Sequence, residues 1–136
     1  MKPITLLTFV LCSFFYSSVF SQNATITIKN KSDRNINLKL MHGPERKAVL
    51  YKTDSIAPKG TIVLDVFETG LYFTKLQAIL YDKKDPEKND TIYSKDRPIQ
   101  LISDKKRGYS NFTIEFKVKE SKNENSISIT RKEYDN

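Results

Sequence analysis

Apolar and polar residues alternate in several short stretches of this chain, and this period of two is the feature that most limits its fold. The clearest stretch is 111–119, and residues 24–30, 36–40 and 126–132 repeat the pattern. Successive side chains of a strand point to opposite faces, so each stretch predicts a strand with one buried face. Strands of this kind are typical of antiparallel sheets, which bury one face and leave the other in water.

Further stretches predict the remaining strands. Residues 47–53, 61–67 and 71–81 are rich in β-branched, aromatic or other apolar side chains. The stretch 71–81 also has some helical spacing, but a strand is favoured. Residues 91–95 and 97–102 predict one or two short strands around Pro98, which cannot donate to a ladder and therefore indicates a sheet edge.

Glycine is confined to the segments between these stretches, as expected if regular elements lie between turns. The sequence therefore predicts an all-β fold, a single antiparallel β-sandwich of seven or eight strands. That domain would span residues 22–136, with a polar C-terminal linker and tail at 119–136. The last residues, 131–136, are expected to fray.

The N-terminal segment has the layout of a secretory signal peptide. Lys2 provides a basic start, an apolar run extends from Ile4 to Phe20, and small and polar residues follow. An uncleaved anchor is the alternative. Removal of residues 1–21 from the 136-residue chain would leave 115 residues and no transmembrane segment. The expected location is secreted, periplasmic or in the cell envelope.

Composition removes most enzyme chemistries. The chain has no Trp, its one Cys is Cys12 in the expected signal peptide, and His42 is its one His. Disulfides, thiol nucleophiles and multi-histidine metal sites are excluded from residues 22–136. No catalytic residue, cofactor or metal is expected. We expect His42 to be a surface loop residue, the alternative being a general base or a lone metal ligand.

The segment 82–90 contains acidic and amide side chains of the kind that Ca²⁺ prefers. Lysines at 83, 84 and 88 stand between them, and their charge would oppose a bound cation. A solvated hairpin loop is the expectation, and a cation site is the alternative.

A net charge of +7 raises the question of an anionic partner. Lys105, Lys106 and Arg107 form the main basic cluster, with Tyr109 beside it. This cluster is a candidate site for an anionic lipid or glycan, because export makes nucleic acid a poor choice. The alternative is a lysine-rich turn that only keeps a hairpin soluble.

The terminal strands are candidates for pairing with another chain, because the edge strands of an open sandwich must be protected or used. Their apolar residues are Ile26, Ile28, Ile127 and Ile129. The sequence therefore predicts a non-catalytic exported binding or assembly module that acts on an envelope protein partner through a sheet edge or loop end. A binder of anionic lipid or glycan surfaces is the alternative.

Three short motifs carry a resemblance. They are Phe20-Ser21-Gln22 at the signal boundary, Gly70-x-Tyr72 before a strand, and Gly108-Tyr109-Ser110 before another. The chain resembles small secreted immunoglobulin-like proteins of Bacteroidota. The resemblance implies an immunoglobulin-like sandwich in which the Tyr72 hydroxyl bonds back to the backbone at a corner. The Cys and Trp of true immunoglobulin domains are absent, so no functional residues are transferred.

Overall fold

A computed structural model describes residues 22–118 and 126–136. The expected signal peptide and the linker 119–125 lie outside the described residues. Strands dominate the described part, together with the 3-10 turn η2 (Pro86–Lys88) and the helix α2 (Arg131–Asp135), so the all-β prediction is confirmed. Within the same ranges, no helix is both long enough and apolar enough to cross a membrane.

Eleven strands lie in the described ranges, and seven of them have six or more residues. The longer strands are β1 (Ala24–Asn30), β2 (Asn35–His42), β3 (Val49–Ile56), β4 (Thr61–Val66), β5 (Gly70–Leu80), β6 (Asp90–Asp96) and β10 (Asn111–Phe116). The short strands are β7 (Ile99–Leu101), β8 (Ser103–Asp104), β9 (Gly108–Tyr109) and β11 (Ser126–Ser128).

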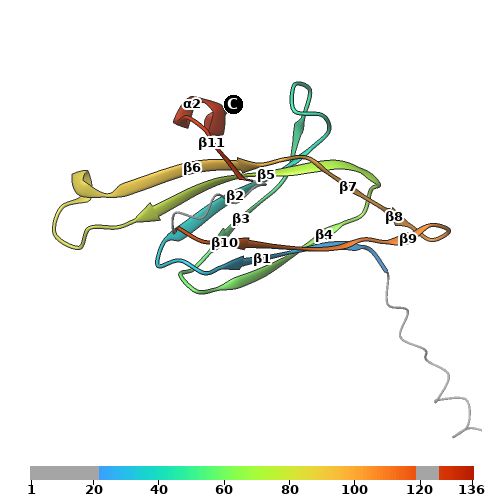
Figure 1. Cartoon of the computed structure of the whole chain (residues 1–136), viewed down its shortest axis with the longest axis horizontal. Coiled ribbons are helices and arrows are strands. Elements are labelled where there is room, and N and C mark those ends of the chain that lie inside the picture. The colour runs from blue at the N-terminus through green and yellow to red at the C-terminus, as the bar shows by residue number, and fades with distance from the viewer. Residues whose placement is uncertain (1–21, 119–125) are drawn as a thin grey trace, which may run out of the picture.

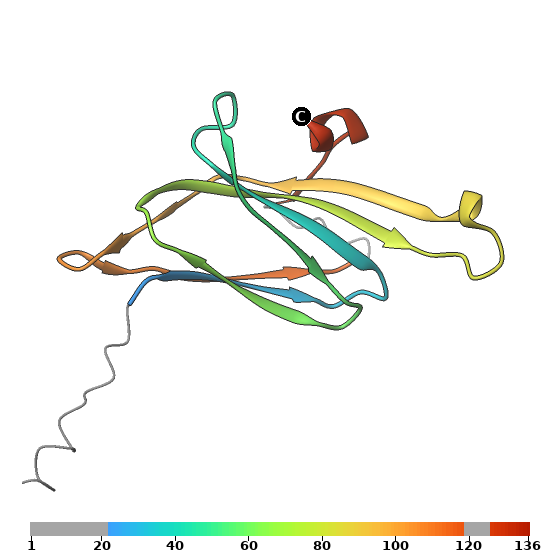
Figure 2. The same ribbon diagram turned by 180° about the vertical axis from the view of Figure 1, so that it is seen from behind.

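The strands form two facing sheets and a small hairpin (Figures 1 and 2). Sheet A has the order β10-β1-β4. Sheet B has the order β11-β6-β5-β2-β3, and β7 pairs with the end of β5. Strands β8 and β9 pair with each other alone among the described strands, and they project at one end of the molecule (Figure 1).

One strand pair is an exception to the predicted antiparallel arrangement. Strand β1 is antiparallel to β4 but parallel to β10. Ile26 of β1 is therefore the register partner of Leu64 on one side and of Phe112 on the other. Alternation along a strand indicates which face it buries, but it carries no information on the direction of the neighbouring strand.

Both sheets contribute to one apolar core. Each fully buried aliphatic or aromatic side chain in this core contributes roughly 1.5–3 kcal/mol to the stability of the fold. The largest of the side chains that are less than 2 % exposed are Tyr72, Ile26, Ile28, Ile36, Leu38, Leu40, Ile56, Leu64, Leu101 and Val66.

The start of β5 is a tight corner, as the resemblance implied. Tyr72 is fully buried, and its hydroxyl donates to the carbonyl oxygen of Glu68 at 2.6 Å. Gly70 lies against the ring of His42, where a Cβ at residue 70 would be 2.6 Å from the His42 Nε2 atom. A side chain at residue 70 would therefore displace the imidazole.

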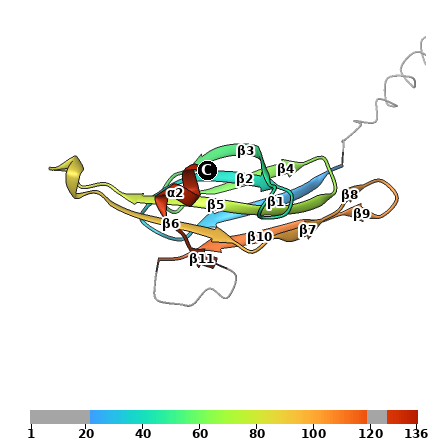
Figure 3. The same cartoon turned by 90° about the horizontal axis from the view of Figure 1, so that it is seen from above.

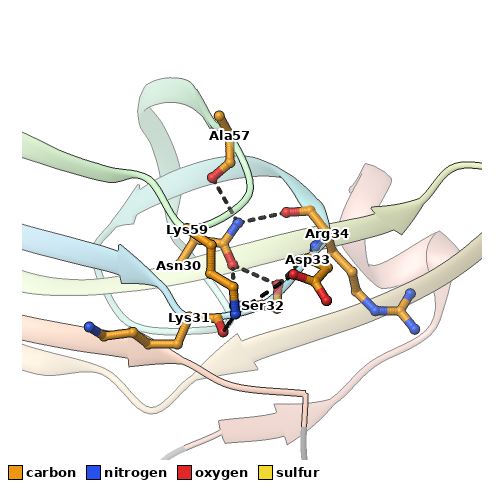
Figure 4. A network of polar contacts seen from close by, with 7 residues as sticks. All are labelled: Asn30, Lys31, Ser32, Asp33, Arg34, Ala57 and Lys59. Carbon is orange, nitrogen blue, oxygen red and sulfur yellow. Dashed lines mark hydrogen bonds and ion pairs between the residues drawn. The ribbon is translucent and has the colours of Figure 1, made fainter.

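The side chain of a buried asparagine, Asn30, forms hydrogen bonds to two turns (Figure 4). Asn30 is 1 % exposed, and its side-chain nitrogen donates to the carbonyl oxygens of Arg34 and Ala57. Its side-chain oxygen accepts from the backbone N–H and the hydroxyl of Ser32. Because every polar group of this amide is bonded, Asn30 can be buried without an unpaired donor or acceptor.

The C-terminal residues are ordered, which corrects the expectation that 131–136 fray. Helix α2 lies on the outer face of sheet B (Figure 3), and Tyr134 is 7 % exposed. The Lys39 ammonium donates to the Tyr134 carbonyl oxygen at 2.9 Å, and Lys75 donates to that of Glu133 at 2.7 Å. Burial of Tyr134 and the hydrogen bonds from Lys39 and Lys75 to helix carbonyl oxygens therefore fix residues 131–136, although their composition is polar.

Candidate functional site

The main candidate site is a groove between the two sheets on one long side of the molecule, where β10 and β7 lie (Figure 3). Its cavity has a volume of about 520 Å³ and is lined from both sheets. This volume is in the range of small-ligand and peptide pockets. Residues that define the groove are Ile26, Tyr72, Phe112 and Ile114, together with the polar Thr74 and Asp96.

Strand β10 forms the apolar wall of the groove. Its even-numbered residues are the register partners of the buried residues of β1, so they face the space between the sheets. Phe116 is 8 % exposed, whereas Phe112 is 38 % exposed and Ile114 is half-buried. The predicted alternation is therefore correct for β10, but sheet B covers its apolar face only at one end.

The outer backbone edge of β10 is also available. The N–H of Thr25 donates to Ser110 O at 2.9 Å, and the N–H of Lys31 donates to Phe116 O at 2.8 Å. The hydrogen bonds to β1 therefore use the backbone groups of even-numbered β10 residues. In a parallel ladder, the backbone groups of alternate residues point to opposite sides of the strand. Within the described residues β10 pairs only with β1. The N–H and C=O groups that face outward are those of Asn111, Thr113 and Glu115.

Sheet B supplies a polar wall. The Thr74 hydroxyl donates to the carboxylate of Asp96 at 2.6 Å. Burial raises the pKa of Asp96 above its usual range, and the hydrogen bond from Thr74 acts in the opposite direction. Ser94, two residues before Asp96 and 6 % exposed, has an Oγ atom without a hydrogen-bond partner among the described residues.

Pro98 separates β6 from β7 at the rim of this wall. Strand β7 pairs with β5 only, within the described ranges. The prediction of a sheet edge around Pro98 is therefore correct for β7, whereas β6, which precedes Pro98, pairs with both β5 and β11.

The predicted pairing edge at Ile26 and Ile28 is wrong. Strand β1 is the middle strand of sheet A, bonded on both sides, and these two residues are 1 % and 0 % exposed. In contrast, Ile127 lies in β11, which pairs only with β6 in the described part, and is 38 % exposed. Ile129 follows β11, and its N–H donates to the Tyr93 carbonyl oxygen.

The predicted basic patch lies at the tip of the β8–β9 hairpin. Lys105, Lys106 and Arg107 are all exposed, and Tyr109 is half-buried in β9. Asp104 accepts hydrogen bonds from the backbone N–H of Lys106 and from the Arg107 side chain, and these bonds lower the pKa of its carboxyl. One carboxylate thus offsets part of the positive charge.

His42 is not the surface loop residue that we expected. It is the last residue of β2, and its ring stacks on Tyr72 at 4.4 Å between centroids and meets Tyr51 edge-on. Its Nδ1 atom lies 3.8 Å from a carboxylate oxygen of Glu68. These contacts pack the His42 ring into the corner at Gly70.

Two acidic side chains of 82–90 bond to the loop itself, while the Asp90 carboxylate pairs with Arg34 outside it. Asp82 accepts from the backbone N–H groups of Lys84 and Asp85, and Asp85 accepts from that of Glu87. In residues 22–118 and 126–136, no group of three or more His, Cys, Asp or Glu side chains is placed to hold a metal ion.

Sequence reasoning missed the groove and its residues Thr74 and Asp96. The signal available was polar residues at positions that face the core, but this signal requires the register of β5 and β6. In comparisons with known proteins, no family model and no curated protein matches this chain.

Proposed function

We propose that this protein is a non-catalytic binding module that takes an extended segment of a partner protein along β10. The supporting observation is the coincidence of the outward-facing backbone groups of β10 with the groove beside them. An added strand would bond to Thr113 and its odd-numbered neighbours, and every second side chain would enter the groove. Phe112 and Ile114 would then lose their exposure.

This edge is favoured over other edges by what lies beside it. Strands β3, β4 and β11 also have one pairing partner each within the described part. The second large cavity, about 720 Å³, is lined mainly by polar and charged residues such as Lys31, Asp33 and Lys59. The β10 edge combines free backbone groups with half-exposed apolar side chains that face inward, which is the arrangement that strand addition uses.

The test is Thr113→Pro, with Thr113→Val as the matched control. Proline removes an N–H that faces away from β1, so sheet A keeps its ladder, and edge positions tolerate proline. The tagged chain is used to capture proteins from its native envelope at low and high salt. We expect a stoichiometric partner that survives high salt with wild type and Thr113→Val, and its loss with Thr113→Pro. Undiminished capture by a folded Thr113→Pro protein would refute the proposal.

We further propose that the fold is an immunoglobulin-like β-sandwich and that the chain is exported with removal of residues 1–21. The shared core of the two sheets and the Tyr72–Glu68 hydrogen bond support the first part. The basic start and apolar run of the N-terminus support the second. Mass spectrometry of the protein from its native host tests cleavage, and an intact N-terminus would exclude it.

The β8–β9 hairpin supports a second candidate function, binding of anionic lipid or glycan surfaces. Its tip projects from the body of the molecule (Figure 1), and its three basic side chains are exposed. Sedimentation with anionic vesicles at two salt concentrations tests it, because salt screens charges beyond about 8–10 Å. Changing Lys105, Lys106 and Arg107 to Glu should abolish binding that is salt-sensitive, and equal binding by this variant would exclude the role.

A further inference from the structure

The groove contains a carboxylate that no positive charge balances among residues 22–118 and 126–136. Asp96 lines the cavity, is half-buried, and receives one side-chain hydrogen bond, from Thr74. Among the described residues, it belongs to none of the ion pairs. Carboxylates withdrawn from water are normally paired, because desolvation of the charge is otherwise uncompensated.

The charged neighbours of Asp96 do not supply this pairing. Arg97 also lines the cavity, but its side chain is exposed and makes no ion pair with Asp96 in the described part of the chain. Lys95 is adjacent in sequence, and its ammonium lies 3.6 Å from the carboxylate of Glu45. Glu115 also lines the cavity, but its carboxylate pairs with the Lys117 ammonium at 3.5 Å.

We propose that the segment bound along β10 carries a lysine or arginine whose side chain ion-pairs with Asp96, between apolar side chains that contact Phe112 and Ile114. This inference rests on the proposed strand addition and specifies the chemistry of its partner. A groove with one apolar wall and one acidic wall selects a strand that presents apolar, basic and apolar residues at alternate positions.

The dimensions of the site allow this contact. Side chains of an added strand that enter the groove are spaced about 7 Å apart along the strand, and packed sheets lie about 10 Å apart. A lysine or arginine on a strand beside β10 can therefore span the space to Asp96 on the facing sheet. Its aliphatic stem would lie against the apolar wall while its charged head reaches the carboxylate.

The probe is a library of random dodecapeptides displayed on phage and selected on the purified full-length chain. Selected peptides are synthesised and their affinities measured for wild type, Asp96→Asn and Thr113→Pro. Asp96→Asn keeps the shape and the hydrogen bond from Thr74, and Asp54→Asn on β3 is the matched control for loss of one negative charge. Circular dichroism establishes that each variant is folded.

We expect the peptides to share a Lys or Arg flanked by apolar residues at the positions two before and two after it. Their affinity should fall at least tenfold on Asp96→Asn and remain unchanged on Asp54→Asn. Peptides that depend on Thr113 but show no basic residue, and bind Asp96→Asn equally well, would overturn this inference and leave strand addition standing. If no selected peptide loses binding on Thr113→Pro, strand addition itself is wrong.

Discussion

The two strands that flank β1 have the same partner and opposite surroundings. Leu64 of β4 and Phe112 of β10 are both register partners of Ile26 and face the same space. Leu64 is 0 % exposed, whereas Phe112 is 38 % exposed. The surroundings decide the difference, because Leu64 lies in the core that both sheets build, whereas Phe112 lines the groove with Asp96, Pro98 and Ile99.

Within sheet A, apolar side chains that face the other sheet can either stabilise the fold or remain partly exposed for binding. On the β4 side, an apolar residue contributes its full burial to folding. On the β10 side, an apolar residue stays partly exposed. Its exposed surface and the outer backbone edge of β10 can then contact a binding partner. An apolar residue at an inward position therefore has two possible uses, and only the opposite layer distinguishes them.

The largest expected effect comes from truncating the two partners of Ile26 separately. Leu64→Ala should reduce the free energy of unfolding by about 2–4 kcal/mol, because it leaves a cavity in the closed part of the core. Phe112→Ala should reduce it by only about 1–2 kcal/mol, because Phe112 is already partly solvated. Urea denaturation followed by circular dichroism measures both. Equal losses would show that the two sides do not differ in solution.

An intermediate effect is expected for Tyr72, which lines the groove and is fully buried. Tyr72→Phe should cost about 1–2 kcal/mol, because the carbonyl oxygen of Glu68 loses its hydrogen-bond donor. Burial, together with the neighbouring Tyr51 and Glu68, raises the pKa of Tyr72 to about 12. The wild type should therefore keep its stability up to pH 10 and lose it as the pH rises towards 12, while the variant lacks this loss.

Denaturant titrations at pH 8 and at pH 11 test the Tyr72 prediction, with Tyr109→Phe as the matched control. The stability difference between wild type and Tyr72→Phe should be smaller at the higher pH. A difference that stays constant would mean that the hydroxyl of Tyr72 contributes nothing to alkaline unfolding.

The smallest expected effect has the opposite sign and lies on the polar wall of the groove. Because burial raises the pKa of Asp96, its ionisation opposes folding, so stability present at low pH is lost as the pH rises through the folded-state pKa. Asp96→Asn should therefore raise the free energy of unfolding at pH 7 by about 0.5 kcal/mol. The gain should vanish near pH 3. Thermal melts over this range measure it, and a less stable variant at pH 7 would contradict it.

Much of the strand content follows from the sequence, because alternation and turn residues are local signals. The strand over 71–81 and the edge strand after Pro98 were predicted for physical reasons that the structure supports. The boundaries differ in detail, since β3 ends at Ile56 and β10 ends at Phe116. Such shifts depend on which neighbour a strand finds.

Long-range features could not be predicted in the same way. The parallel pairing of β1 and β10 joins residues far apart in the chain, and no local pattern encodes it. Helix α2 has five residues, and its order depends on contacts of Tyr134 with sheet B. The groove itself exists because Phe112 and Phe116, at equivalent positions in the alternation, face different parts of the opposite sheet.

The central place of β1 also has a consequence for the order of folding. Neighbouring strands of sheet B, such as β2 with β3 and β5 with β6, follow one another in sequence and can form early hairpins. Sheet A instead requires Thr25 to meet Asn111, 86 residues later. The chain between these two residues must close into a loop before their contacts can contribute to stability, and this closure costs entropy. Strand β1, which is synthesised before the other described strands, is therefore expected to be among the last of them to be fixed in place. Any truncation before β10 leaves Ile26 and Ile28 on a two-stranded remnant of sheet A.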